Sequence, residues 1–476
     1  MVIMKSIERF RQEYIPHTRR PGLRTSARRW GAAVIAAVSA TALTVGFPSG
    51  AFAQGSIRDA EIEATIRDFA TPLFRAAGLN PDSVDIYIRK DDQINAFVAG
   101  GQNLFLNTGF LLETRSPLEV IGVIAHETGH ISGGHLARTS DVIRNASNAA
   151  IIATVLGVVA AAASGNAGAG AALALGGSNV AERSFLSYSR NQESAADQAA
   201  LKYLDATGQS SVGLADFLGT LEDQELLSAS SRSPYLSTHP LTRERINSVR
   251  NHLTESRYSK QPATADQKER YDRMIAKLFA FIRPPGRTFQ KYPETHTSLP
   301  ARYARAIAYF EIPDFTRALA EADGLIADRP ADPFFHELRG QILFENGRPV
   351  EAEPSYRKAH ELLPNNDQLT FQYARVLLSL NNPQADQEAL RLLDTAMAGE
   401  SQWPEFWRQR AIANGRTGRL AEAALDLAEQ AVRTRRWKDA VEQARRAQSQ
   451  VPAGSAIALR ALDIEDQAKR EIDRKK

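Results

Sequence analysis

A spacing of 34 residues recurs through the second half of the chain and constrains its fold more than any other feature. The positions that repeat at this interval are Ala306, Gly340 and Ala374; Pro313, Gly347 and Asn381; Ala318 and Ala352; and Pro330 and Pro364. A later copy keeps the internal offsets with Ala411, Gly418 and Ala423. Small residues at fixed positions let paired helices approach closely, and a proline ends each unit. The interval therefore predicts stacked helical units from about Pro300 onward.

This period resembles that of tetratricopeptide repeats, which are helix–turn–helix units that stack into a curved solenoid. We count four or five units, because Pro354, Trp403 and Pro404 depart from the regular pattern and the last copy around Trp437 is blurred. Such arrays usually bind extended segments or partner proteins on a concave face. The alternative is that the helices serve only as structural padding.

In the first half, His126, Glu127 and His130 form the pattern H-E-x-x-H inside an apolar stretch. Ser116 followed by Pro117 is typical of a helix start, so the stretch is predicted to be a buried helix. Residues four apart lie on one face, so both imidazoles can converge on one Zn²⁺, with Glu127 beside them to take a proton from water. The alternative is a pair of core histidines. The pattern predicts a zinc-dependent protease with one zinc ion per chain.

A catalytic zinc ion usually takes a third protein ligand. The nearest candidate is His135, but the compact H-E-x-x-H-x-x-G-x-x-H pattern needs a histidine at the position of Leu136, so we reject it. Glu193 and Asp197 are a better pair, four residues apart in a helical segment predicted over about residues 180–206. One carboxylate can bind the metal while the other accepts the N–H of a ligating histidine. Alone, such a pair is more often a solvated helix face.

Together these motifs resemble the M48 peptidases, a family that includes periplasmic members with tetratricopeptide tails. Three further stretches match the family: residues 95–101 (N-A-F-V-A-G-G), residues 104–109 (L-F-L-N-T-G), and Thr238-His239-Pro240 with Arg245 downstream. The resemblance covers roughly residues 56–255. It implies that His126, His130 and Glu193 bind zinc, that Glu127 is the catalytic carboxylate, and that Asp197 supports a ligand.

His239 and Arg245 have two interpretations each. His239 could cap the metal as a fourth ligand in a resting state, or polarise the scissile carbonyl, and Arg245 could stabilise the oxyanion of the tetrahedral intermediate. The alternative is a His-Pro turn that starts a helix at Leu241, with Arg245 paired to a nearby carboxylate.

The sequence also suggests how substrate is held. Residues 84–88 alternate in polarity, and residues 96–99 and 104–107 are predicted strands joined through Gly100-Gly101. In zinc proteases an extended peptide commonly adds to an exposed sheet edge beside the metal. We expect that edge to consist of Asn95, Ala96, Phe97, Val98 and Ala99. The alternative is an internal hairpin strand.

The N-terminus predicts export. Arginines up to Arg29 precede an apolar run over residues 32–47, and Ala51-Phe52-Ala53 is an A-x-A cleavage site. We therefore expect a signal peptide over residues 1–53, with an unusually long charged leader, and a periplasmic location; an uncleaved anchor is the alternative. The leader holds eight basic and two acidic residues, so its removal changes the net charge from +3 to −3 and indicates no nucleic-acid partner. The absence of cysteine excludes disulfides and thiolate zinc ligands.

An apolar segment with a glycine-rich break spans residues 149–175. Its longest uninterrupted apolar run, over residues 149–163, is shorter than the roughly 20 residues that span a bilayer, so the segment is predicted to be a helical hairpin. It would act as a lid or make peripheral contact with a membrane or an apolar substrate, or it is a buried helix pair.

The predicted fold is mainly α. A gluzincin-type metallopeptidase domain with a small β-sheet occupies residues 54–255, a linker with a helix at Tyr271–Ile282 occupies residues 256–299, and an all-α solenoid follows over residues 300–476. The resemblance implies a zinc endopeptidase acting on misfolded or stalled envelope proteins, with the repeats docking clients or the outer-membrane assembly machinery. One alternative is a chaperone or adaptor with a latent zinc site. Another is an integral membrane peptidase, but no spans are found after residue 53.

Overall fold

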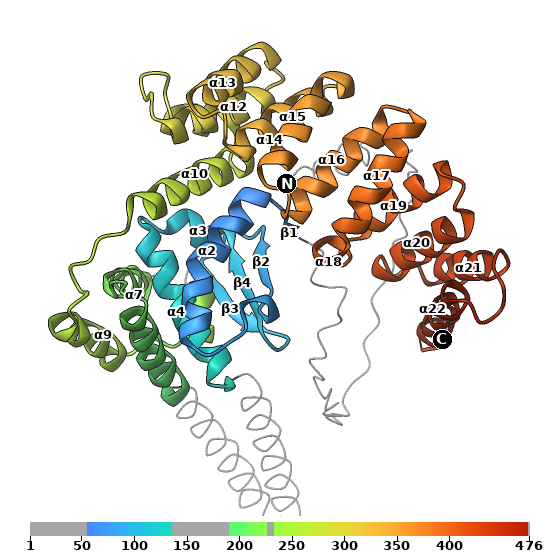
Figure 1. Ribbon diagram of the computed structural model, residues 1–476. Coiled ribbons are helices and arrows are strands. Elements are labelled where there is room, and N and C mark those ends of the chain that lie inside the picture. Colours follow the sequence, from blue (N-terminus) through green and yellow to red (C-terminus); the bar gives the residue numbers. More distant parts are fainter. Residues whose placement is uncertain (1–54, 136–189, 226–232, 475–476) are drawn as a thin grey trace, which may run out of the picture.

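The computed structural model describes residues 55–135, 190–225 and 233–474. Figure 1 shows a small sheet surrounded by helices, a long connecting helix, and an arc of paired helices that extends to the C-terminus. The mainly α architecture with a small sheet and a helical array is confirmed. The predicted signal peptide and the apolar segment at residues 149–175 lie outside the described residues.

The sheet has four strands in the order β1-β2-β4-β3. Their bounds are Ser56–Ile57 for β1, Ile86–Arg89 for β2, Asn103–Asn107 for β4 and Ala96–Ala99 for β3. Strands β2 and β4 are parallel, and the other two pairs are antiparallel. Gly100 and Gly101 turn β3 into β4 with φ of 60° and 102°, a backbone region that favours glycine. In the sheet formed by the described residues, strand β3 lies at one end.

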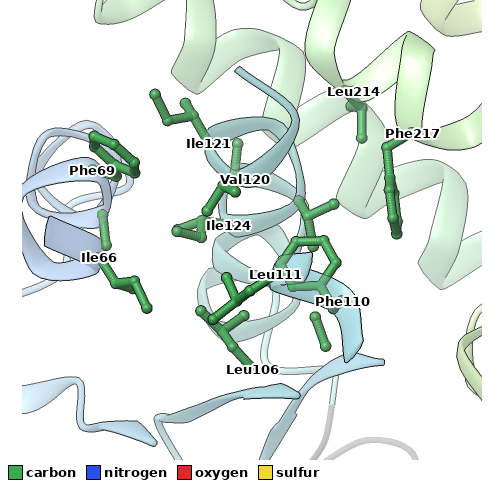
Figure 2. Packing of buried hydrophobic residues seen from close by; sticks show 14 of the residues in the cluster. Ile66, Phe69, Leu106, Phe110, Leu111, Val120, Ile121, Ile124, Leu214 and Phe217 are labelled. Atoms are coloured by element: carbon green, nitrogen blue, oxygen red, sulfur yellow. The ribbon is translucent and has the colours of Figure 1, made fainter. Parts of the chain in front are cut away.

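Helix α4 (Pro117–Ser132) is the centre of this half of the molecule. Ser116 caps it by accepting a hydrogen bond from the Glu119 N–H, and Pro117 occupies the first turn, as predicted. Every residue from Pro117 to Gly129 is buried. In Figure 2 the apolar side chains of α4 lie between those of α2 (Ala60–Ala76) and those of α7 (Val212–Glu225). The histidine pair is thus carried by a helix that is fixed on several sides.

The connecting helix α10 (Ala265–Ile282) begins before the predicted Tyr271, because Thr264 and Gln267 form a capping box at its start. In the chain, α8 (Pro234–Thr238) and α9 (Arg243–Glu255) precede α10, and α11 (Pro285–Lys291) follows it. Helix α3 (Thr108–Glu113) directly follows strand β4. The repeat helices are α12 (Leu299–Glu311), α13 (Phe315–Asp328), α14 (Pro333–Glu345), α15 (Pro349–Leu362), α16 (Asp367–Ser379), α17 (Pro383–Thr395), α18 (Met397–Glu400), α19 (Pro404–Arg416), α20 (Leu420–Arg433), α21 (Trp437–Gln448) and α22 (Ala456–Asp473).

The repeat period has the predicted physical origin. A Cβ added at Gly340 would lie 2.7 Å from the ring of Tyr356, so the small residue at this repeat position leaves room for that ring between α14 and α15. Gly347 and Asn381, which are 34 residues apart, turn one helix of a pair into the next with φ of 72° and 51°. The short extra helix α18 precedes Trp403 and Pro404, which accounts for their departure from the period.

Buried ion pairs join the two halves. Lys277 of α10 lies 2.9 Å from Asp59 and 3.4 Å from Glu61, beside the first turn of α2. Glu61 also accepts a hydrogen bond of 2.7 Å from the hydroxyl of Tyr303 in α12. Arg58, just before α2, pairs with Glu400 at 2.6 Å. Buried charges remain stable only when each is closely paired, so these contacts hold the arc against the start of α2 in one orientation.

Glycines set the contact between α4 and α7. A Cβ at Gly122 of α4 would lie 2.7 Å from the backbone nitrogen of Leu214, and a Cβ at Gly213 of α7 would overlap the backbone of Leu118. Gly219, on the same helix α7, has no atom within 4 Å of its added Cβ. Gly213 and Gly219 therefore offer a matched comparison on one helix, because an added methyl group would clash at Gly213 and would meet nothing at Gly219.

We expect Gly213→Ala to destabilise the protein by about 1–3 kcal/mol or more, because the new methyl group meets backbone that cannot move freely. Gly219→Ala should be neutral or stabilising by up to about 1 kcal/mol, because alanine favours the helix. Urea unfolding followed by circular dichroism measures both. Equal unfolding midpoints for the two variants would contradict the packing described for α4 and α7.

Candidate metal centre

Two helices bring four polar side chains together in the core. Helix α4 supplies His126 and His130, and the helical residues 190–206 supply Glu193 and Asp197. The Nε2 atoms of the two imidazoles lie 3.1 Å apart. Glu193 bridges them, with Oε2 3.3 Å from Nε2 of His126 and Oε1 3.3 Å from Nε2 of His130. Both pairs are spaced by four residues, which places each pair on one helix face. Donor atoms from distant parts of the sequence thus converge on one point.

Asp197 and Arg245 lie behind this cluster. The Asp197 carboxylate lies 2.8 Å from Nδ1 of His126, the ring nitrogen that faces away from Glu193. Arg245, near the start of α9, donates to Asp197 from Nε at 2.6 Å and from Nη2 at 2.9 Å. Its Nη1 lies 2.9 Å from Glu193. Arg245 thus contacts both carboxylates and holds their helix against α9.

His239 completes the cluster and Glu127 adjoins it. Nδ1 of His239 lies 3.2 Å from both Glu193 oxygens, and its Nε2 lies 3.5 Å from Oε1 of Glu127. One donor atom each from His126, His130, Glu193 and His239 lies within 4.8 Å of the others, as a set of metal ligands requires. Both oxygens of Glu127 are buried and have no hydrogen-bond partner among the described residues. Its carboxylate is therefore free to exchange a proton.

Burial and charge set the protonation of these groups. Burial opposes ionisation of Glu193, yet His239 and the other two histidines hold its pKa well below its usual range. Burial lowers the pKa of His126, but the hydrogen bonds that its ring donates to the Asp197 and Glu193 carboxylates raise it to about 10. Burial raises the pKa of Glu127. The cluster is thus anionic at its carboxylates and favours a positive charge between the imidazoles, which a proton or a metal ion can supply.

The two helices that carry the cluster touch backbone to backbone. A Cβ added at Gly129, between the two histidines on α4, would lie 2.7 Å from the carbonyl oxygen of Ala196. Ala196 lies between Glu193 and Asp197 in the chain. The absence of a side chain at Gly129 is therefore what lets the carboxylates reach the imidazoles.

All seven predicted catalytic, metal-binding and supporting residues meet here. The predicted edge strand is also nearby, since β3 packs beside α4 and α8. Sequence reasoning missed Tyr235, whose ring stacks on His239 with centroids 4.4 Å apart. In the sequence, only its position four residues before His239 could have indicated that the two rings share one helix face.

Comparison with known proteins agrees with this geometry. Residues 56–253 match the model of Peptidase family M48, and residues 343–413 match a tetratricopeptide repeat model. The chain is 25% identical over 358 residues to the beta-barrel assembly-enhancing protease of Escherichia coli K12, covering 71% of this chain and 69% of that protein. It is 24% identical over 346 residues to the protein of that name from Yersinia pestis, and the match covers 70% of this chain and 68% of that protein. Metalloprotease LoiP of Escherichia coli K12 is 29% identical to this chain over 189 residues, and the match covers 39% of this chain and 69% of that protein.

The fold and the cluster, taken with these matches, define a metallopeptidase. More particularly, the chain carries an M48 peptidase domain followed by tetratricopeptide repeats. Within residues 55–135, 190–225 and 233–474, no helix is both long and apolar enough to cross a membrane.

If the cluster holds a metal ion, we expect Gly129→Ala to weaken its affinity for added Zn²⁺ at least about tenfold, because an added methyl group separates helices whose candidate ligand atoms must meet within a few tenths of an ångström. Competition with a chromophoric chelator measures the affinity, and circular dichroism checks that the variant is folded. Gly219→Ala is the control and should bind zinc as the wild type does. A folded Gly129→Ala protein with unchanged zinc affinity would contradict this role of the helix contact.

Proposed function

We propose that this protein is a zinc-dependent endopeptidase in which His126, His130 and Glu193 hold one Zn²⁺. The observation that carries the proposal is the convergence of their donor atoms, with separations of 3.1–3.3 Å. Four ligands at about 2.0–2.1 Å around a tetrahedral zinc ion lie about 3.3–3.4 Å from one another. Nitrogen and carboxylate donors also suit zinc, and the chain has no cysteine that would indicate a thiolate site. The residues present therefore fit the ion.

A bound zinc ion would supply Lewis acidity, polarising the scissile carbonyl and making a water molecule easier to deprotonate. Glu127 is the proposed general base that takes the proton from this water. Its burial supports the role, because burial raises the pKa of its carboxyl and so favours taking up a proton. Both of its oxygens also have no hydrogen-bond partner among the described residues. Glu127 then passes the proton to the leaving amine, so that the carboxylate is regenerated at the end of each cycle.

Asp197 is proposed to orient His126, since its carboxylate lies 2.8 Å from the ring nitrogen opposite the cluster. The position of His239 is compatible with both roles considered for it, a fourth ligand at rest and a group that polarises the carbonyl. For Arg245 the geometry favours pairing with carboxylates over a direct contact with an oxyanion. Its Nε, Nη1 and Nη2 all have partners in Asp197, Glu193 or the carbonyl of Pro240.

Substrate is proposed to bind as an added strand along β3. This strand ends the described sheet and lies beside α4, so a peptide paired with it would run past the cluster. Main-chain hydrogen bonds give affinity without demanding a sequence, which suits a protease for unfolded chains. Residues Asn95 to Val98 are the proposed contact.

The proposed clients are misfolded or stalled proteins of the bacterial envelope, with outer-membrane β-barrel precursors as the first candidates. Support comes from the names of the relatives in Escherichia coli and Yersinia pestis, which link them to β-barrel assembly. The repeats are proposed to dock clients or the assembly machinery. The proposed signal peptide, residues 1–53, would direct export to the periplasm. The peptidase domain would occupy residues 54–255, the connector residues 256–299 and the repeat array residues 300–476. Any peripheral membrane contact would be made by residues 149–175.

A second candidate is a chaperone or adaptor in which the repeats do the work and the metal site is latent. The closely paired helices of the array favour it, because a stacked repeat surface binds protein without any catalysis. The two candidates differ in whether cleavage by Glu127 is needed.

We expect Glu127→Gln to keep its zinc and to lose casein cleavage by at least about 10²–10⁴-fold, because an amide cannot take a proton from water. Metal analysis and a cleavage assay on the purified protein measure both quantities. Glu119→Gln is the matched control, since Glu119 is also a buried glutamate on α4 but lies outside the cluster. Undiminished cleavage by Glu127→Gln would refute the proposed base, and a complementation phenotype that survives the substitution would favour the chaperone.

A further inference from the structure

His135 lies outside the set of candidate ligands, yet it is 92% buried and contacts one of them. Its Nδ1 lies 3.0 Å from Nδ1 of His130, and the two rings meet edge to face with centroids 5.0 Å apart. His130 directs its other nitrogen, Nε2, towards His126 and Glu193. His135 thus contacts His130 from behind, on the side away from the cluster.

The contact constrains where protons can be. Two ring nitrogens 3.0 Å apart share one hydrogen, because two lone pairs or two N–H groups would repel each other. A ligand imidazole must present a lone pair to the metal, and its remaining proton then lies on the other nitrogen. His130 therefore donates from Nδ1, and His135 accepts at Nδ1 and carries its own proton on Nε2.

The backbone around His135 is built to hold it there. A Cβ at Gly133 would lie 2.5 Å from Nε2 of His135 and 2.8 Å from its Cδ2, so this glycine makes room for the ring at the end of α4. The Gln192 side chain donates a hydrogen bond of 3.1 Å to the carbonyl oxygen of His135. Gln192 immediately precedes Glu193, so the same contact ties the residue to the helix that carries the third proposed ligand.

We infer that His135 is a positioning residue that fixes the tautomer and ring orientation of His130 for metal binding. The inference rests on the proposed function, because it assumes that His130 is a ligand. His135 thereby performs for His130 the part that Asp197 performs for His126. One ligand is oriented by a carboxylate and the other by a neutral ring, so this half of the site gains orientation without a second buried negative charge.

The test is zinc affinity, measured on the full chain by competition with a chromophoric chelator. His135→Leu removes the acceptor while keeping most of the volume, and should weaken zinc binding about 10–100-fold. His135→Asn places an amide oxygen near the position of Nδ1 and should recover affinity to within about threefold of the wild type. His336→Leu, on α14 of the repeats, is the control and should match the wild type.

Thermal unfolding of the metal-free proteins distinguishes a loss of ring positioning from a general loss of stability. If His135 acts only by positioning His130, the leucine and asparagine variants should have the same melting temperature without metal. Wild-type zinc affinity in folded His135→Leu would overturn the inference and leave the proposed function intact. Equal weakness of the leucine and asparagine variants would also overturn it, because the ring itself rather than its acceptor would then matter. A wild-type protein that binds no zinc would instead refute the proposed function.

Discussion

The contact between Gly129 and Ala196 is the constraint on which the rest of the site depends. It lets two helices meet backbone to backbone, where an added Cβ would lie 2.7 Å from a carbonyl oxygen. Only at that separation do short carboxylate side chains reach the imidazoles of the facing helix. Helix α4 gains its rigidity from burial along its length and from a similar close approach to α7. The geometry of the cluster is therefore a property of helix packing before it is a property of the polar residues themselves.

Apart from Glu127, the polar residues of the cluster then form a chain of contacts in which each buried charge has a partner. Arg245 contacts Asp197 and Glu193, and Asp197 contacts His126. A second network of the same kind is centred on Lys277 and Glu61. It reaches the repeats through Tyr303, which donates to Glu61, and Glu337, which pairs with Lys277. Because unpaired buried charges are costly, both networks favour one arrangement of the elements that carry them. The first turn of α2 is consequently part of the surface on which the arc of helices rests, and any docking by the repeats must use other parts of the arc.

Much of this could be predicted from the sequence, because periodicity and spacing are local. The 34-residue interval predicted the helix pairs, the H-E-x-x-H pattern predicted the buried helix, and Gly100-Gly101 predicted the turn between β3 and β4. The insertion of α18 and the early start of α10 were not predicted, since they depend on single capping and packing contacts. Whether Arg245 faces substrate or carboxylate, and what His135 touches, depends on three-dimensional packing that no spacing encodes. His135 was rejected as a ligand on spacing alone, and its contact with Nδ1 of His130 became visible only in the structure.

The central claim is that His126, His130 and Glu193 together hold one metal ion, and Glu193→Ala tests it most directly. The wild type and the variant are dialysed against limiting zinc and their metal content is measured by atomic emission. The account predicts about one zinc ion per wild-type chain and almost none in a folded Glu193→Ala protein, because the cluster then loses its only carboxylate donor. A folded variant that retains one zinc ion per chain would contradict the account, since the third ligand would then lie elsewhere.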